Sequence, residues 1–437
     1  MLALSPIQSL GWLSIIRLGF VQTSIGAIVV MTTSTLNRIM VVELALPAIL
    51  PGLLVAFHYF VQVIRPRMGF ASDQGLYKTP WILGGIIVLG LGGIGAAIGT
   101  VMMAESVLQG IIVSFFAFLM IGIGVSMSGT SLLALLAKSV DDQKRAAAAT
   151  IVWLMMIFGI ALTAGVSGQF LDPYSPERLM TVVSIIALLA IVLTVLAIWN
   201  IERSVSPRAS EPDIPFQEAL REVWAESKTR NFTIFVFLSM NAYFMQELIL
   251  EPYAGLVFAF TPGQSTSLSG AQNGGVFVGM LTVGIMATGF KIGSLRRWVM
   301  SGCYGSGAVL LLICLSGLMS TALNFTYLVV ALGFFNGMFA VSAISAMMAL
   351  ASSSGGRGQR EGTRMGLWGA AQAIAAGFGG LTGAVLVDMT RSFLADGPAF
   401  GAVFIFEAAL FFAAALMAMR VIEHKVQPVP ANLVAGE

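Results

Sequence analysis

Charged residues are scarce in this sequence: only 10% of its 437 residues are Asp, Glu, Lys or Arg. A soluble domain carries roughly a quarter charged residues, so this scarcity excludes a chain of ordinary water-soluble domains. The net charge of +2 is also small, and it does not indicate a nucleic-acid partner. With 57% hydrophobic residues, the composition fits the lipid bilayer as solvent, and lipid is the first partner that it predicts.

Cysteine and histidine are also rare, with two residues of each. Cys303 and Cys314 are eleven positions apart in one apolar run, which places them ~16 Å apart along a helix axis and beyond the reach of a disulfide. The sequence has no phosphate-binding loop and no Ser, His and Asp arrangement typical of a hydrolase. We therefore expect neither a protein-built metal site nor an enzyme.

Twelve apolar stretches, each near the ~20 residues that cross a bilayer as a helix, occupy most of the chain. The first is too long for the apolar part of a cleaved signal peptide, so it is expected to remain as the first span. The predicted spans are residues 18–40, 45–64, 80–103, 110–137, 146–170, 179–200, 232–253, 271–290, 298–318, 324–351, 365–387 and 399–422. This pattern predicts an all-α polytopic membrane protein with six-helix halves at residues 1–200 and 232–437 and a linker at residues 201–231.

Basic residues divide unevenly between the two sides of the predicted spans. The side with both termini and the linker has 20 of the 23 Lys and Arg residues, and only Arg38, Arg178 and Arg391 lie on the other side. Because positively charged loops stay in the cytoplasm, both termini are expected to be cytosolic. In the linker, apolar residues such as Phe216 and Leu220 recur at helical spacing, which predicts an amphipathic helix on the membrane surface.

The two halves repeat parts of one pattern. At a shift of 215 positions, Arg145 matches Arg360, Trp153 matches Trp368, Gly165 matches Gly380 and Gly168 matches Gly383. At a shift of 204, Asn37 matches Asn241 and Glu43 matches Glu247. The change from 204 to 215 predicts extra residues in the second half, in a loop at residues 261–273. Such a repeat is typical of a pseudo-symmetric transporter-like fold.

Polar and ionisable side chains inside apolar spans are costly, so they indicate either function or structural pairing. The candidates for ligand binding or proton coupling are Asn37, Arg38, Glu43, His58, Asn241, Glu247 and Glu251. Glu247 and Glu251 are one helical turn apart, so they share a helix face and together could hold a proton. In the alternative interpretation, Arg38 pairs with a carboxylate, and polar groups satisfy backbone atoms freed at helix ends by Pro47 and Pro252.

His58 is the only histidine within a predicted span. A neutral imidazole can ligate the magnesium of a chlorin, which makes His58 a candidate pigment ligand. A buried histidine also serves as an ordinary hydrogen-bond partner between helices, and no second His, Cys or acidic residue accompanies it at metal-site spacing. Both interpretations stay open.

Glycine is abundant, with 48 residues, and small residues recur one turn apart. Examples are Gly92, Ala96 and Gly99 in the third span and Ala375, Gly379 and Gly383 in the eleventh. Small residues at this spacing let helix backbones approach closely. The pattern therefore predicts tight helix packing, with a flat slot for a planar ring as the alternative.

The loop after the second span, Gly69-Phe70-Ala71-Ser72-Asp73-Gln74-Gly75-Leu76-Tyr77-Lys78, resembles the signature loop of the major facilitator superfamily. The resemblance implies that Gly69 lets two helices approach and that Asp73 faces a helix N-terminus near residues 362–364, where a carboxylate is favoured. Lys78 is the basic residue that closes the motif. The match is partial, because Gln74 replaces a basic residue and Leu76 and Tyr77 replace Gly and Arg. The alternative is a polar turn with cytosolic charges.

Three further stretches resemble the PucC family of photosynthetic bacteria, also called the bacteriochlorophyll-delivery family. They are Thr35-Leu36-Asn37-Arg38-Ile39-Met40-Val41-Val42-Glu43-Leu44, the stretch from Arg65-Pro66-Arg67 to Thr79-Pro80-Trp81, and Gln246-Glu247-Leu248-Ile249-Leu250-Glu251-Pro252 with Ala254-Gly255-Leu256. The resemblance implies an assembly factor for light-harvesting antenna complexes that binds or delivers bacteriochlorophyll as cargo. It also implies antenna polypeptides and pigment-synthesis enzymes as partners, and a place in the bacterial inner, intracytoplasmic photosynthetic membrane.

The residues are compatible with two other functions. The first is a proton-coupled secondary transporter of a small amphipathic solute, with Glu247 or Glu251 as the coupling residue. The second is an accessory subunit of a lipid-modifying or pigment-synthesising enzyme. The first, fourth, seventh and tenth spans offer mostly neutral groups such as Gln22, Ser126 and Asn336, which argues against a charged substrate.

Overall fold

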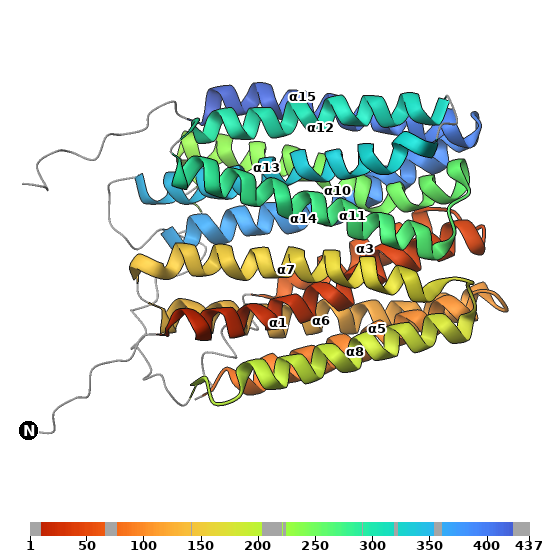
Figure 1. Ribbon diagram of the computed structural model, residues 1–437, viewed down its shortest axis with the longest axis horizontal. Helices are drawn as coiled ribbons and strands as arrows, with labels where there is room; N and C mark the ends of the chain where they lie inside the picture. Colours follow the sequence, from red (N-terminus) through yellow and green to blue (C-terminus); the bar gives the residue numbers. More distant parts are fainter. Residues whose placement is uncertain are drawn as a thin grey trace, which may run out of the picture.

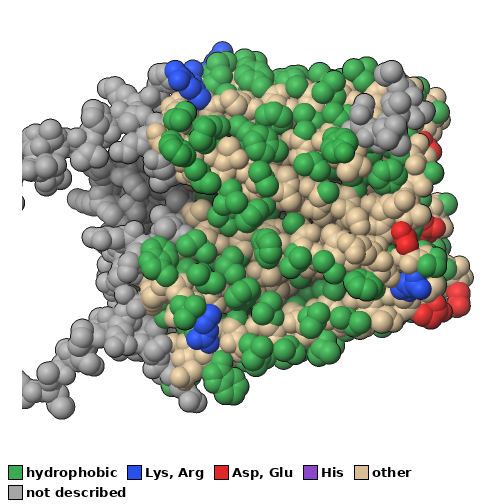
Figure 2. Space-filling model, viewed as in Figure 1, with side chains coloured by type: hydrophobic (Ala, Val, Ile, Leu, Met, Phe, Trp, Pro, Cys, Tyr) green, Lys and Arg blue, Asp and Glu red, His purple; other side chains and the backbone are tan. Residues whose placement is uncertain are grey.

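The computed structural model describes residues 10–65, 77–140, 142–202, 221, 224–290, 292–318, 322–353 and 361–422. These ranges form a bundle of long, roughly parallel helices (Figure 1) and contain no β-strand. Ten of the helices in these ranges are long and apolar enough to cross a membrane, and hydrophobic side chains cover much of the flank of the bundle (Figure 2). The predicted all-α polytopic fold is confirmed.

The amino-terminal half contributes six helical rods. The first rod is continuous and consists of α1 (Trp12–Val30), the π-helical η1 (Met31–Thr35), α2 (Leu36–Arg38) and the π-helical η2 (Ile39–Glu43). The second rod is short and consists of α3 (Ile49–Val61) and η3 (Gln62–Ile64). The other four are α5 (Thr79–Met102), α6 (Val107–Ser139), α7 (Asp142–Leu171) and α8 (Pro176–Ile198).

The carboxy-terminal half has the same organisation. Its helices are α10 (Ser227–Phe258), α11 (Pro262–Val283) with the π-helical η5 (Gly284–Gly289), α12 (Leu295–Leu318), α13 (Ala322–Ser353), α14 (Glu361–Arg391) and α15 (Asp396–Val421). The second rod is short and α11 begins with polar residues. These two rods are therefore not among the ten helices that are long and apolar enough to cross a membrane. The described ranges thus contain twelve rods, six on each side of the linker.

The helix bounds establish how the two halves correspond. Trp12 and Ser227 begin the first rod and α10, and Glu43 and Phe258 end them, so both ends differ by 215 positions. The predicted shift of 204 for this pair is therefore wrong, although a shift of 215 holds. Glu43 ends its rod, whereas Glu247 lies eleven positions before the end of α10.

The eighth helix begins earlier than the hydrophobic pattern predicts. Thr261 Oγ1 accepts a hydrogen bond from the Gln264 backbone N–H at 3.2 Å, and Gln264 Oε1 accepts one from the Thr261 N–H at 3.0 Å. This reciprocal cap, followed by Pro262, starts a helix within polar sequence. The predicted loop at residues 261–273 is wrong, and Ser265, which that loop would expose, is fully buried.

The first residues of α1 and the last of α15 lie at one end of the bundle, here called the terminal end (Figure 1). The opposite end, here called the far end, carries the turns at residues 44–48, 103–106, 172–175, 259–261 and 392–395. Acidic side chains gather at the far end (Figure 2); they include Glu43, Glu105, Asp172, Glu177, Asp388 and Asp396. Arg38, Arg178 and Arg391 are the basic residues of the described ranges at that end.

Small residues bring helix backbones together, as their spacing predicts. A Cβ added to Gly92 of α5 would lie 2.9 Å from backbone atoms of Ala117 and Ile121 in α6. Between the halves, Gly270 of α11 lies against the α7 backbone at Gly165, and Gly52 of α3 contacts α14. The halves therefore meet along α7 with α11 and along α3 with α14.

Candidate functional site

The part of the first rod that contains η1 and α2 presents a polar band between the two halves. Ser34, Thr35, Asn37 and Arg38 are only 1–4% exposed. Wide π turns interrupt the regular side-chain register of a helix and are frequent at functional sites. Polar groups buried this deeply in a membrane protein need partners, and these residues find them in the other half.

Glu251 of α10 forms the centre of one set of contacts. Ser34 Oγ donates to Glu251 Oε1 and lies 3.0 Å from Ser269 Oγ of α11. Thr35 Oγ1 lies 3.1 Å from Thr266 Oγ1, also of α11. Glu251 is 3% exposed, so its carboxyl group belongs to a buried junction that joins the first rod to α10 and α11.

Asn37 completes a hydrogen bond that a proline removes. Pro252 lies inside α10 and has no backbone N–H, so the carbonyl of Leu248, four residues earlier, loses its helical donor. Asn37 Nδ2 donates to this carbonyl at 2.7 Å. The predicted partner for a backbone group freed by Pro252 is thus present, but α10 continues to Phe258, so the prediction that Pro252 marks a helix end is wrong.

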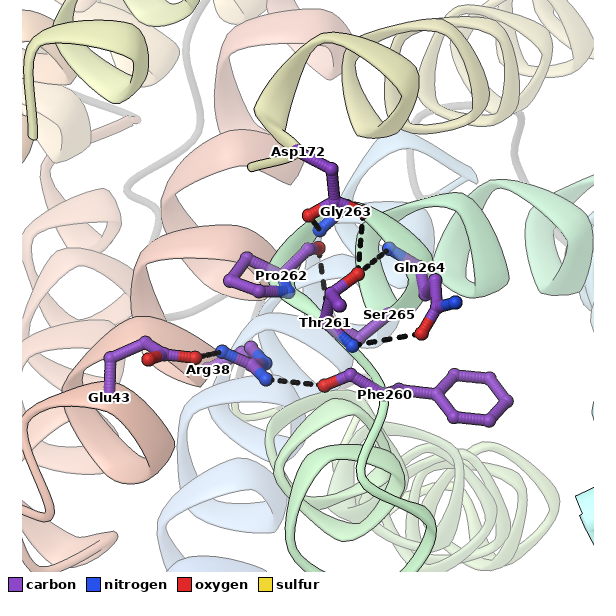
Figure 3. A network of polar contacts seen from close by, with 9 residues as sticks. All are labelled: Arg38, Glu43, Asp172, Phe260, Thr261, Pro262, Gly263, Gln264 and Ser265. Atoms are coloured by element: carbon purple, nitrogen blue, oxygen red, sulfur yellow. Dashed lines mark hydrogen bonds and ion pairs between the residues drawn. The ribbon is translucent and has the colours of Figure 1, made fainter. Parts of the chain in front are cut away.

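Arg38 connects the halves at the far end. Its guanidinium forms an ion pair with Glu43, and its Nη2 donates to the Phe260 carbonyl at 2.6 Å, just beyond the end of α10 (Figure 3). A cation is favoured at a helix C-terminus by the helix dipole. The predicted pairing of Arg38 with a carboxylate is confirmed, and Glu43 is that partner.

Glu247 has different surroundings from Glu251, although the two are one turn apart. It is partly exposed, and it interacts electrostatically with Thr33 of the first rod, with Tyr59 and with Tyr243. The Tyr59 ring of α3 meets the Phe244 ring edge-on, with centroids 6.1 Å apart. Glu247 is therefore a partly exposed carboxylate beside aromatic rings, whereas Glu251 is enclosed by hydroxyl groups.

The remaining predicted residues lie elsewhere. Asn241 is buried where α10 crosses Gly379 of α14. His58 lies between α3 and α6, within the amino-terminal half, where its Nδ1 is 2.6 Å from the Val55 carbonyl and its ring is 6.2 Å from that of Phe118. This backbone partner supports the structural interpretation and leaves Nε2 as the nitrogen for any ligand.

The signature-like loop is only partly visible in the described ranges. Gly69 and Asp73, and with them the predicted contact near residues 362–364, lie outside the part that can be described, whereas Lys78 is buried. The backbone N–H groups of Lys78 and Thr79 donate to the Glu202 carboxylate at 2.5 and 2.8 Å. Glu202, which no sequence motif indicates, thus caps α5 from the end of the same half.

Two more acidic residues were not predicted, and both reach across the halves. Asp172, after α7, accepts from the Gly263 N–H at 3.1 Å and from Thr261 Oγ1 at 2.5 Å (Figure 3). Asp388, in the last turn of α14, accepts from the Ala48 and Ile49 N–H groups at 3.0 and 2.8 Å. In the sequence, each of them stands at the end of an apolar span. This position is the only indication of a role that the sequence gives.

Comparison with known sequences gives matches along nearly the whole chain. The family described as PUCC protein matches residues 35–426. The "Bacteriochlorophyll synthase 44.5 kDa chain" of Rhodobacter capsulatus is 58% identical over 432 residues, which are 98% of this chain and 100% of the relative. "Protein PucC" of Rhodobacter capsulatus is 29% identical and covers 86% of this chain and 83% of its own length.

Solved structures share the fold at low sequence identity. A peptide transporter, POT, in complex with alafosfalin superposes with a TM-score of 0.68 at 13% identity, covering 95% of this chain and 98% of the transporter. An inward-facing, unoccupied bacterial homologue of the human lysosomal transporter Spinster gives a TM-score of 0.62 at 13% identity, covering 94% and 95%. The predicted major facilitator fold is confirmed by these neighbours.

Proposed function

Because the chain belongs to the PUCC protein family, we propose that it is an assembly factor for a photosynthetic antenna complex, and that it holds bacteriochlorophyll and passes it on. The observation that carries the proposal is the family match over residues 35–426. A 58% identical relative is named for bacteriochlorophyll, and more distant relatives are named PucC. The proposal makes pigment a cargo and antenna polypeptides the partners.

The surroundings of Glu247 suit such a cargo. A macrocycle with a long alkyl tail partitions into apolar surroundings, and aromatic rings such as those of Tyr59, Tyr243 and Phe244 stack against flat rings. Magnesium prefers oxygen ligands, among them carboxylates. Glu247 is thus the candidate ligand where α10 meets the amino-terminal half, and the His58 imidazole is the alternative within that half.

Pigment retention tests the assignment to Glu247. Glu247→Gln keeps the side-chain shape but offers a neutral oxygen, so we expect it to weaken bacteriochlorophyll binding at least about tenfold, the effect of changing even the hydrogen-bond partner of a metal ligand. The measurement is the pigment-to-protein ratio after purification in mild detergent. Glu105→Gln, at an exposed position in the far-end turn, is the control and is expected to match the parent protein. Loss of pigment in His58→Ala, with normal retention in Glu247→Gln, would move the site to the imidazole.

A second candidate function is an accessory chain of a pigment-synthesising enzyme. The name of the 58% identical relative favours it. We prefer the assembly role because relatives named PucC match most of the chain as well. The two roles differ in the pigment precursors that a strain without the protein would contain. Proton-coupled transport of an amphipathic solute is the further alternative, to which the transporter fold of the solved neighbours lends support.

We place the protein in the bacterial inner, photosynthetic membrane with its terminal end in the cytosol, following the uneven division of basic residues. Single cysteines in a Cys303→Ser, Cys314→Ser background test this orientation. Ala225→Cys lies near the terminal end and Ser392→Cys in a far-end turn, and both positions are exposed. An impermeant thiol reagent applied to the periplasmic side is expected to label only Ser392→Cys. Labelling of Ala225→Cys alone would reverse the orientation.

A further inference from the structure

We infer that Asp172 and Asp388 form a two-part latch that holds the far end closed, and that both parts must release before the halves separate there. The latch is defined as these two carboxylates and the backbone N–H groups that they bind, at Gly263 and at Ala48 and Ile49. The inference concerns the conformational cycle of the fold, so it does not depend on which cargo the protein carries.

The first part of the latch joins the end of α7 to the start of α11. Asp172 Oδ1 accepts from the Gly263 N–H, and its Oδ2 accepts from the hydroxyl of Thr261, which also caps α11 (Figure 3). The first N–H groups of a helix have no partner within the helix, and the helix dipole favours a negative charge beside them. A carboxylate from the amino-terminal half therefore completes a helix of the other half.

The second part of the latch repeats the first with the roles of the two halves exchanged. Asp388 on α14 belongs to the carboxy-terminal half, and its two carboxylate oxygens accept from the Ala48 and Ile49 N–H groups at the start of α3. Each carboxylate oxygen accepts from one amide, so the free N–H groups at this helix start find their acceptors in the other half. Each half thus contributes one carboxylate that binds a helix start of the other half.

The two parts occupy equivalent positions in the repeat. Ala48 and Gly263, whose N–H groups bind the carboxylates, are 215 positions apart, which is the shift that relates the first rod to α10. Asp172 and Asp388 are 216 positions apart. Pseudo-symmetric halves that rock against each other are expected to make and break equivalent contacts together. The symmetry therefore indicates that the carboxylates act as a pair rather than as two unrelated helix caps.

The residues beside the latch are buried while the halves are in contact at the far end. Ser265 and Thr266, which follow the cap of α11, are fully buried, and Thr266 pairs with Thr35 of the first rod. Ser34 and Thr35 of the amino-terminal half cover this junction, so separation of the halves at the far end would open it, and Ser265 beside it, to water. The far-end pair Arg391 and Asp396, at 2.7 Å, lies within the carboxy-terminal half and does not cross between the halves. Asp396 is thus a matched control for a far-end carboxylate that is not part of the latch.

Distances between spin labels test the latch. Labels on Glu105→Cys and Ser392→Cys report the separation of the halves at the far end, since both positions are exposed and each belongs to one half. We expect Asp172→Asn and Asp388→Asn each to raise the ratio of long to short distances about tenfold, the effect of weakening a charge-assisted hydrogen bond. The double variant is expected to populate mainly the long distance, whereas Asp396→Asn stays like the parent.

Chemical accessibility gives a second measurement on the same variants. In the cysteine-free background, Ser265→Cys is expected to react slowly with an aqueous maleimide in the parent and several times faster with both latch residues changed. Variants are compared only where size-exclusion chromatography shows a single folded species; Asp172→Ser, which keeps a capping oxygen without charge, is the milder replacement. Unchanged distances and an unchanged labelling rate in the double variant, or equal changes in Asp396→Asn, would overturn the latch.

Discussion

Gly275→Ala is expected to destabilise the protein strongly, whereas Gly274→Ala, one position earlier, is expected to leave it as stable or slightly more stable. A Cβ added at Gly275 would collide with the backbone carbonyl of Val330 in α13, whereas one added at Gly274 has no neighbour within 4 Å. The contact partner is backbone, which cannot rotate away, so α11 and α13 would have to separate. Overpacking of this kind costs about 1–3 kcal/mol.

The collision belongs to a reciprocal contact between two helices. Gly279 faces the Phe334 carbonyl, and Gly333 and Gly337 of α13 face carbonyls of α11. Because α11 also carries Ser269 and Thr266, displacement of this helix would disturb the junction around Glu251. Leucine at Gly275 is expected to prevent accumulation of folded protein.

Thermal unfolding followed by size-exclusion chromatography measures these effects. At Gly274, Ala removes the extra backbone freedom of Gly in a helix, a gain of about 1 kcal/mol at most. The adjacent positions belong to the same helix and receive the same methyl group, so the difference between the two variants reports the contact of Gly275 with α13. Equal unfolding temperatures for the two Ala variants would show that α11 and α13 do not pack as closely as described.

The spans and their order could be predicted from the sequence because a membrane-spanning helix requires a long apolar run. The pairing of Arg38 followed from the cost of a lone buried charge, and the close packing at Gly92 followed from small residues one turn apart. These are local signals. Each requires only residues within one or two turns of helix.

Contacts between distant parts of the chain could not be predicted in the same way. Asp172 and Gly263 are 91 positions apart, and Asp388 and Ala48 are 340 apart, so no local pattern connects them. The start of α11 was missed because Thr261 begins a polar stretch, and capping rather than hydropathy sets a helix start there. The matching of Glu43 with Glu247 failed because identical residues recur by chance within similar helices.

The two carboxylates on α10 show the same limit for the candidate site. Their spacing predicts a shared helix face, but the different neighbours of Glu247 and Glu251 come from other helices. Ser34 and Ser269 enclose Glu251, and their positions depend on how the halves meet. Both residues could therefore be selected from the sequence, whereas only the structure distinguishes the enclosed carboxylate of Glu251 from the partly exposed one of Glu247.

Deletion of the gene is expected to have the largest functional effect. If the protein delivers pigment to nascent antenna polypeptides, its loss leaves synthesis of bacteriochlorophyll intact but prevents assembly. At least one antenna complex should then lose most of its near-infrared absorption, while bacteriochlorophyll precursors stay at parental levels. If the protein were instead an accessory chain of a pigment-synthesising enzyme, the precursors would accumulate, because the substrate of a blocked step builds up. Complementation with the parent sequence is the control.

The measurement that tests the proposed function most directly is therefore the near-infrared absorption spectrum of the deletion strain, recorded together with its pigment precursors. The assembly role predicts a diminished antenna band with no accumulation of precursors, restored by the intact gene. A normal antenna band, or a diminished band accompanied by accumulated precursors, would contradict it.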